Sequence, residues 1–241
     1  MAQKQALEKQ EQGFARHVLP KLPDVKSHAL VACGIRRCGK STLLRQFVRK
    51  LGRDFFYLNF YDIRLAEFTH ADYALLDTAI AETGTRLLFF DEIQSAQRWE
   101  LYARQKLEEG FQLVLTGANA SLLSRELGTR LTGRHIAKDI YPFSYLEFCE
   151  FSGQQTGAAS LGSYLEKGGF PEYLKSGNAD ILTQLQSDIL YRDIAVRYGI
   201  RDATSLRRLF VYLVSNMGQL FSPRKLTDVA GVKSPTTVLE T

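Results

Sequence analysis

One run of the chain, residues 34–41, has the composition and spacing of a loop that binds phosphate. It reads G-I-R-R-C-G-K-S and matches the P-loop pattern G-x-x-x-x-G-K-[ST] at every fixed position. The glycines free the backbone to wrap a phosphate, so that N–H groups of the loop and of the next helical turn point at it. The residues that we expect to bind a nucleotide are Gly34, Ile35, Arg36, Arg37, Cys38, Gly39, Lys40, Ser41 and Thr42.

Two side chains of this loop have a specific chemistry. Lys40 would reach the β- and γ-phosphates, and the hydroxyl of Ser41 would be a ligand of Mg²⁺. Residues 28–33 before the loop form a short apolar run, as a buried parallel strand does, and residues 42–48 after it place apolar side chains at helical spacing. Strand, glycine loop and helix in this order favour a nucleotide site over a chance match on a glycine-bearing turn.

A second pair of reactive side chains, Asp91 and Glu92, follows the apolar run of residues 87–90. Such a run predicts a fully buried strand with both carboxylates at its C-terminal end. There Asp91 would hold Mg²⁺ or its water shell, and Glu92 would polarise an attacking water as general base. The alternative is an ordinary strand that exits into an acidic loop, but the P-loop upstream favours the catalytic interpretation.

Polar side chains further along the chain are candidates for completing the site. Thr116 and Asn119 lie at the tip of the next predicted strand, where such a residue would sense the γ-phosphate or the water; a turn rich in small residues is the alternative. Arg125, Arg130 and Arg134 are candidates for an arginine that neutralises charge in the transition state. We expect Asn119 and Arg134 to join Lys40 and Glu92 as catalytic residues, Arg134 because it follows a glycine turn.

The elements that must position these side chains alternate between strand and helix. Predicted strands cover residues 28–33, 55–60, 87–90, 111–116 and 136–140, and predicted helices cover residues 42–48, 70–82, 99–109 and 121–131. This alternation is typical of a parallel α/β sheet, in which the C-terminal ends of the strands face the ligand. Asp62, just past the second strand, lies at the same edge, and capping of a loop is its favoured role.

Composition restricts the class of protein. With 241 residues, of which 45% are hydrophobic and 24% charged, the chain resembles ordinary soluble globular proteins. It has no apolar run of membrane-spanning length and begins with polar residues, so we expect a cytoplasmic protein without membrane contact. The 3 cysteines and 4 histidines show no metal-ligand spacing. A net charge of +5 permits contact with nucleic acid.

After residue 144 the strand-like runs end and helical patterning replaces them. Residues 205–218 have amphipathic helical spacing. Ser222, followed by a proline, has the type expected at a helix cap, and Gly231 marks a turn before a further predicted helix. Two short helices joined by a glycine turn are typical of a helix-turn-helix. Such a segment would bind DNA or a protein partner, and the hairpin of a winged version would lie beyond Thr241.

Several motifs in a fixed order resemble one family. They are the P-loop, residues 87–92, residues 115–119, residues 131–134 with Tyr141-Pro142-Phe143, and the turn Gly168-Gly169-Phe170-Pro171. From about Val25 onward the chain resembles prokaryotic AAA+-like P-loop ATPases that carry a winged-helix segment and a further C-terminal domain of uncharacterised function. By this resemblance Gly169 and Pro171 approach the nucleotide. The C-terminal domain of the family, which is nuclease-like in fold, is absent from this sequence, so no activity of that domain is expected.

Two functions of different classes are compatible with these features. In the first, the chain is an ATPase that binds ATP and Mg²⁺ and uses hydrolysis to drive a conformational switch. The absence of an [NT]-K-x-D motif favours ATP over GTP. In the second, the chain is a nucleotide-gated DNA-binding regulator with slow or incidental hydrolysis, which the arginines of residues 197–224 support and nearby aspartates weaken. A small-molecule kinase would need an acceptor lid, which we do not identify.

The predicted architecture is an α/β P-loop NTPase sheet of the AAA+ type, followed by a helical region. Its predicted parts are an N-terminal helical arm at residues 1–24, the P-loop ATPase core at residues 25–144, a helical lid or linker at residues 145–204, and a partial winged helix-turn-helix at residues 205–241. An arginine, supplied either by the same chain or by a neighbouring subunit of a homo-oligomer, would complete the site.

Overall fold

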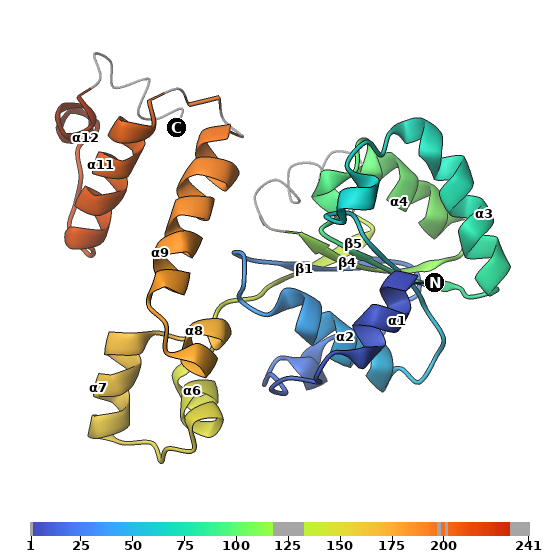
Figure 1. Cartoon of the computed structure of the whole chain (residues 1–241), viewed down its shortest axis with the longest axis horizontal. Coiled ribbons are helices and arrows are strands. Elements are labelled where there is room, and N and C mark those ends of the chain that lie inside the picture. Colours follow the sequence, from blue (N-terminus) through green and yellow to red (C-terminus); the bar gives the residue numbers. More distant parts are fainter. Residues whose placement is uncertain (1, 118–132, 197–198, 201, 232–241) are drawn as a thin grey trace. The chain divides into compact units, whose positions relative to one another are not determined.

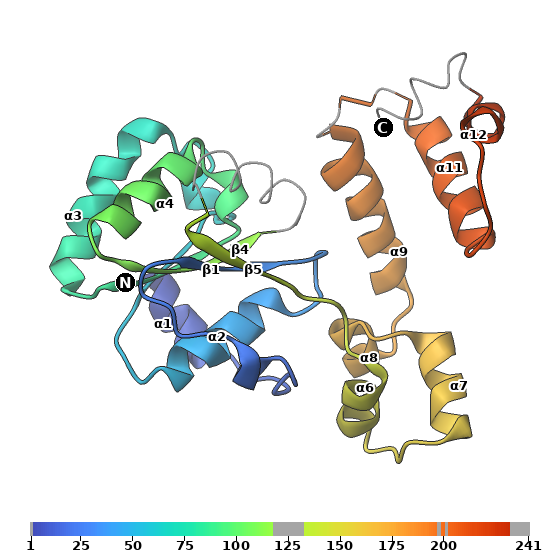
Figure 2. The same cartoon turned by 180° about the vertical axis from the view of Figure 1, so that it is seen from behind.

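A computed structural model describes residues 2–117, 133–196, 199–200 and 202–231 of the chain. By their contacts the residues divide into two compact units, Met1–Lys175 and Ser176–Thr241. Figures 1 and 2 show these units from opposite sides. The finer division into four parts remains a prediction.

Within the described residues, the first unit contains one sheet of five parallel strands. The strands are β1 (Ala29–Cys33), β2 (Phe56–Asn59), β3 (Leu87–Asp91), β4 (Gln112–Gly117) and β5 (His135–Asp139). Their order is β2-β3-β4-β1-β5, so β4 separates the strand before the P-loop from the strand that carries Asp91. The order and direction of the strands confirm the predicted α/β fold.

Helices cover both faces of the sheet (Figures 1 and 2). On one face lie α1 (Ala2–Lys9) and α2 (Lys40–Lys50), and on the other lie α3 (Tyr73–Thr83) and α4 (Trp99–Glu108). Because successive side chains of a strand point to opposite faces, Leu30 and Phe89 pack with α2, whereas Val31 and Phe90 pack in the cluster of α3 and α4. Burial on both faces explains the uninterrupted apolar runs of β1 and β3.

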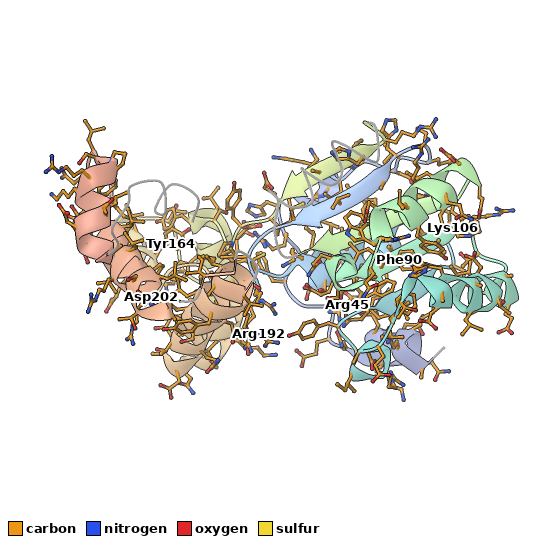
Figure 3. The ribbon with its side chains drawn as sticks, turned by 90° about the horizontal axis from the view of Figure 1, so that it is seen from above. Arg45, Phe90, Lys106, Tyr164, Arg192 and Asp202 are labelled. Carbon is orange, nitrogen blue, oxygen red and sulfur yellow. The ribbon has the colours of Figure 1, made fainter. Side chains whose placement is uncertain are left out.

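Residues 2–17 pack along α2, the helix that begins in the P-loop. Gln46 of α2 donates to the carbonyl oxygens of Gln12 and Phe14, at 2.7 and 3.1 Å. Arg45, labelled in Figure 3, donates to a side-chain and a backbone oxygen of the same segment. These bonds tie residues 10–14 to the helix that begins in the phosphate-binding loop.

Short turns of 3₁₀ helix connect the longer elements. They are η1 (Leu19–Lys21), η2 (Ile63–Leu65), η3 (His70–Asp72) and η4 (Ile93–Ser95). Asp62 is the N-cap of η2 and accepts from the N–H of Arg64 at 3.0 Å, as expected for a capping residue.

Helices follow the sheet. They are α6 (Tyr145–Ser152), α7 (Ala158–Lys167) and α8 (Pro171–Ser176), and in the second unit α9 (Asp180–Ser187), the π-helix η5 (Asp188–Ala195), α11 (Ala203–Ser215) and α12 (Pro223–Ala230). Ser222 caps α12, and Gly231 ends it with φ of 73°. The second helix of the predicted helix-turn-helix lies outside the described residues, so neither that motif nor a winged helix is confirmed. Among the described helices, none has the combination of length and apolar character needed to cross a membrane.

Candidate functional site

The P-loop connects β1 to α2 and ends at the first turn of that helix. Gly39 is the N-cap of α2 with φ of 97°, a conformation that a residue with a β-carbon rarely adopts. Lys40 follows and is 4% exposed, and its Nζ donates to the carbonyl oxygens of Gly34 and Ile35 at 3.0 and 2.9 Å. The ammonium group therefore lies inside the curve of the loop.

Position 34 must be glycine because the backbone just after β5 approaches it closely. Its φ is 150°, and a β-carbon at this position would lie 2.1 Å from the carbonyl oxygen of Ile140, directly after β5. The thiol of Cys38 donates to that same oxygen at 3.2 Å. The P-loop is thus packed against the end of β5, and only glycine fits at its first position.

Asp91 ends β3 and lies next to the first turn of α2. Its Oδ1 accepts from the Ser41 hydroxyl at 2.9 Å and from the Thr116 hydroxyl, and its Oδ2 accepts from the Tyr57 hydroxyl at 3.1 Å. Asp91 is 3% exposed. Burial raises the pKa of its carboxyl, and the hydrogen bonds of Thr116, Ser41 and Tyr57 oppose that rise.

This donor set suits Mg²⁺. Magnesium is usually held by one or two protein oxygens together with phosphate oxygens and waters, rather than by a cage of protein ligands. The carboxylate of Asp91 and the hydroxyl of Ser41 are hard oxygen ligands that lie within hydrogen-bond distance of each other. The described residues contain no cluster of three histidine, cysteine or acidic side chains that would form a metal cage.

Glu92 directs its side chain to a different place from Asp91. Its φ is 52°, in the left-handed region, and its N–H donates to Thr116 Oγ1 at 2.8 Å. The amide of Gln94 donates to Glu92 Oε2 at 2.6 Å. Through its hydrogen bonds Thr116 holds the two acidic residues in place. Because it is fully buried, it is not exposed to a ligand.

A cavity of about 420 Å³ opens beside these residues, a volume that fits a small ligand. The predicted residues Gly39, Lys40, Ser41, Thr42 and Glu92 line one part of it. Other lining residues come from the segment before β1 and from the helices after β5; they are Gly13, Phe14, Arg16, Phe143, Phe151, Pro171, Glu172 and Lys175, together with Arg37 of the P-loop. All of them belong to the first unit.

Three aromatic rings form the apolar part of this cavity. The ring centroid of Phe14 lies 5.1 Å from that of Phe143 and 6.0 Å from that of Phe151. The rings of Phe143 and Phe151 are 5.2 Å apart. Such a cluster offers flat apolar surface to the cavity, whereas Lys40, which also lines it, provides positive charge.

Arg16 joins three segments beneath the cavity. Its Nη1 donates to the Cys38 carbonyl at 3.1 Å, and its Nη2 donates to the Tyr141 carbonyl at 2.9 Å. Its Nε and Nη2 also donate to both carboxylate oxygens of Glu147, at 2.9 and 3.1 Å. Arg16 is 8% exposed, and Glu147 is 3% exposed. The sequence analysis missed both residues; the spacing of Ser144 and Glu147 could have indicated a capping box, which the structure contains.

The side chains of the other variable P-loop residues contact neighbouring segments or solvent. Arg37, with φ of 61°, donates through Nη1 to both carboxylate oxygens of Glu172 on α8, each at 2.7 Å. The guanidinium of Arg36 lies 5.6 Å from the ring centroid of Tyr61, and Ile35 is 39% exposed. The side chains of the loop thus contribute contacts to the surroundings, while its backbone forms the cradle.

The remaining predicted site residues lie in different places. Pro171 lines the cavity, whereas Gly169 packs its backbone against Phe143, whose N–H donates to the Gly169 carbonyl at 2.7 Å. Arg134 is exposed at the start of β5, and its carbonyl accepts from the N–H of Ala29 at 3.0 Å. Because β5 is parallel to β1, Arg134 lies at the N-terminal ends of these strands, whereas the P-loop follows the C-terminal end of β1. Asn119, like Arg125 and Arg130, lies outside the described residues.

Comparisons with known proteins assign a family to the part of the chain that builds this site. A family model described as an AAA domain matches residues 26–149. A second model, described as a domain of unknown function, matches residues 158–239. Neither description mentions a nuclease.

Two relatives are identical to this chain at about a third of the aligned positions. An uncharacterised protein of Methanocaldococcus jannaschii is 32% identical over 216 residues, which cover 83% of this chain and 49% of that protein. An uncharacterised protein of Haemophilus influenzae is 32% identical over 215 residues, which cover 82% of this chain and 54% of that protein. The chain thus spans about half the length of these relatives.

Solved structures show more distant similarity. DnaA of Aquifex aeolicus bound to AMPPCP is 15% identical with a TM-score of 0.41, and the match covers 92% of this chain and 82% of DnaA. The RuvB Holliday junction branch migration motor of Thermotoga maritima is 18% identical with a TM-score of 0.48, and the match covers 99% of this chain and 85% of RuvB. Orc1 of Aeropyrum pernix, in complex with DNA, is 12% identical with a TM-score of 0.48, covering 93% and 79%.

Proposed function

Because the chain belongs to the AAA domain family through residues 26–149, we propose that it is an ATPase that binds ATP and Mg²⁺ at the P-loop and hydrolyses the ATP to drive a conformational switch. One observation carries the proposal. The hydroxyl of Ser41 and the carboxylate of Asp91, 50 residues apart in sequence, are hydrogen-bonded at 2.9 Å, and Ser41 directly follows Lys40, whose buried ammonium lies inside the curve of the P-loop. This arrangement supports a role of all three groups toward a single triphosphate.

Each part of the site has a role in this proposal. The N–H groups of the P-loop and Lys40 bind the phosphates, and the aromatic cluster of Phe14, Phe143 and Phe151 accepts the adenine ring by stacking or edge contacts. Ser41 and Asp91 hold Mg²⁺, which when bound supplies positive charge to the phosphate oxygens. Glu92, which lines the same cavity, takes a proton from the attacking water.

ATP binding and turnover by the purified chain test this proposal. We expect a fluorescent ATP analogue to bind, phosphate to be released, and Lys40→Ala to weaken nucleotide binding at least about tenfold through loss of a charge that contacts phosphate. Lys50→Ala is the matched control, because Lys50 is an exposed residue at the end of the same helix. Wild-type protein that binds no ATP, or equal affinities of Lys40→Ala and wild type, would contradict the proposal.

A nucleotide-gated DNA-binding regulator is the second candidate. The exposed side chains of Arg207, Arg208, Arg224 and Lys225 on α11 and α12 support it. The same assay separates the two candidates when it is repeated with duplex DNA at several salt concentrations. Binding that depends on nucleotide and weakens steeply with salt, together with negligible phosphate release, would favour the regulator.

A further inference from the structure

Among the described residues, Asp91 accepts hydrogen bonds from Ser41 on the P-loop helix, from Thr116 near the end of β4 and from Tyr57 within β2. Tyr57 lies in the middle of β2, whose register against β3 pairs Tyr57 with Phe89 and Asn59 with Asp91. Because side chains two residues apart in a strand share a face, Tyr57 and Asp91 project on the same side of the sheet. The phenol ring extends along this face and its hydroxyl donates to Asp91 Oδ2 at 3.1 Å.

The two oxygens of the Asp91 carboxylate are held by different groups. Oδ1 accepts from Ser41 and Thr116, and Oδ2 accepts from Tyr57. The last torsion of an aspartate side chain has a broad energy profile, so hydrogen bonds decide how the carboxylate plane is turned about the Cβ–Cγ bond. The Tyr57 donor on Oδ2 acts with the two donors on Oδ1 to fix this torsion.

We propose that Tyr57 is a positioning residue for the metal-binding carboxylate: its hydroxyl holds Oδ2 so that Oδ1 stays directed at the hydroxyl of Ser41. The inference rests on the proposed function, because it assigns Tyr57 a role toward the Mg²⁺ that Ser41 and Asp91 would hold. Partners of this kind, which orient a metal ligand without touching the metal, typically change metal affinity or activity by about 10–100-fold when they are removed.

The ring of Tyr57 has its own packing, which makes the hydroxyl separable from the fold. The ring centroid lies 5.0 Å from that of Phe89, within the buried cluster on the α2 face. Tyr57→Phe keeps this ring and removes only the oxygen, so a change in metal binding cannot be assigned to lost aromatic packing.

The test compares the Mg²⁺ dependence of nucleotide binding in wild type and Tyr57→Phe. A fluorescent ATP analogue is bound first in the presence of EDTA and is then titrated with MgCl₂; the electron paramagnetic resonance signal of free Mn²⁺ reports metal uptake independently. We expect equal metal-free affinities, an apparent metal dissociation constant about tenfold or more higher in Tyr57→Phe, and a turnover deficit that shrinks as Mg²⁺ is raised to saturation.

Tyr73→Phe is the matched control. The Tyr73 hydroxyl donates to the Gln97 carbonyl at 2.9 Å, and its ring packs with the cluster on the other face of the sheet. This variant loses the same atom and should titrate like wild type. Metal constants of Tyr57→Phe and wild type within twofold of each other would overturn the role of Tyr57 while leaving the ATPase proposal intact. Wild-type binding that does not respond to metal would overturn both.

Discussion

Glu92 has a left-handed backbone, with φ of 52°, one residue after a buried strand. For a residue with a β-carbon such a conformation costs about 1–3 kcal/mol and persists where the surroundings impose it. Here the N–H of Glu92 donates to the buried hydroxyl of Thr116 at 2.8 Å, and Gln94 binds its carboxylate. The turn of the chain at this residue lets Asp91 stay buried beside Ser41 while Glu92 lines the cavity.

Glu92→Gln tests the catalytic role of this carboxylate. The amide keeps the size of the side chain but cannot accept a proton, so we expect turnover to fall about 10²–10⁴-fold. Nucleotide affinity should stay within about twofold of wild type, because the phosphates are bound by Lys40 and the P-loop amides. Phosphate release and binding of a fluorescent ATP analogue measure the two effects.

Glu108→Gln is a suitable control for that experiment. Glu108 is the last residue of α4, and it pairs on the surface with Arg104 at 2.9 Å. This exposed substitution should leave both measurements unchanged. Undiminished turnover in Glu92→Gln would remove Glu92 from the mechanism.

At the scale of elements, the hydrogen bonds of Arg16 hold together the segments that form the site. This residue connects the segment before β1 to the P-loop through Cys38 and to α6 through Glu147. Burial acts to raise the pKa of Glu147, but hydrogen bonds from Arg16 and from the N–H groups of Ser144 and His17 outweigh it and lower the pKa to about 2. The pair therefore stabilises the fold only while Glu147 is ionised.

This lowered pKa predicts how stability depends on pH. The ordinary pKa is 4.5 and the folded value is about 2, so the contribution is fully present above about pH 4.5 and is lost as the pH falls toward 2. A difference of this size corresponds to about 3 kcal/mol. We expect the gap in unfolding free energy between wild type and Glu147→Gln to shrink by that order between pH 5 and pH 2, as measured by urea unfolding.

Glu150→Gln provides the comparison for this pH series. Glu150 is an exposed residue on the same helix and contacts His17 at 2.9 Å. Because both side chains of this pair are exposed, its substitution should change the unfolding free energy by less than about 1 kcal/mol. A gap for Glu147→Gln that stays constant from pH 5 to pH 2 would show that the ion pair with Arg16 is not linked to folding.

At the scale of the whole molecule, the position of Arg134 bears on how a complete site could form. Arg134 precedes β5, and the P-loop packs against Ile140 just after that strand. The five residues of β5 span about 16 Å at the usual rise of a strand. Arg134 is therefore too far from the cavity of its own chain to act there, and a role as the transition-state arginine requires a second copy of the chain.

Mixing two inactive variants tests this arrangement. Arg134→Ala keeps the nucleotide cavity, and Glu92→Gln keeps Arg134. If a neighbouring subunit supplies the arginine, each variant alone should lose about 10³-fold or more in rate, and a mixture should regain part of the wild-type activity. The specific activity of wild type should also rise with protein concentration. Full activity of Arg134→Ala would exclude the role.

The sequence alone determined the features that depend on the spacing of residues within one segment of the chain. The features of this kind are the P-loop, the Asp91–Glu92 pair, the order of strands and helices, the cap at Ser222 and the family resemblance from about Val25 onward. The strand order confirms the fold, and the AAA match over residues 26–149 confirms the family. Such features can be predicted because hydrogen bonding and burial within one element impose a local pattern of residue types.

The tertiary structure decided which distant residues complete that pattern. Tyr57 meets Asp91 across 34 positions, and Arg16 meets Glu147 across 131. Tyrosine in a strand or arginine before one is compatible with many surroundings, so no residue type or interval indicates these contacts. They arise from the register of β2 against β3 and from the packing of the N-terminal segment on α2, which are settled only when the whole sheet and its helices assemble.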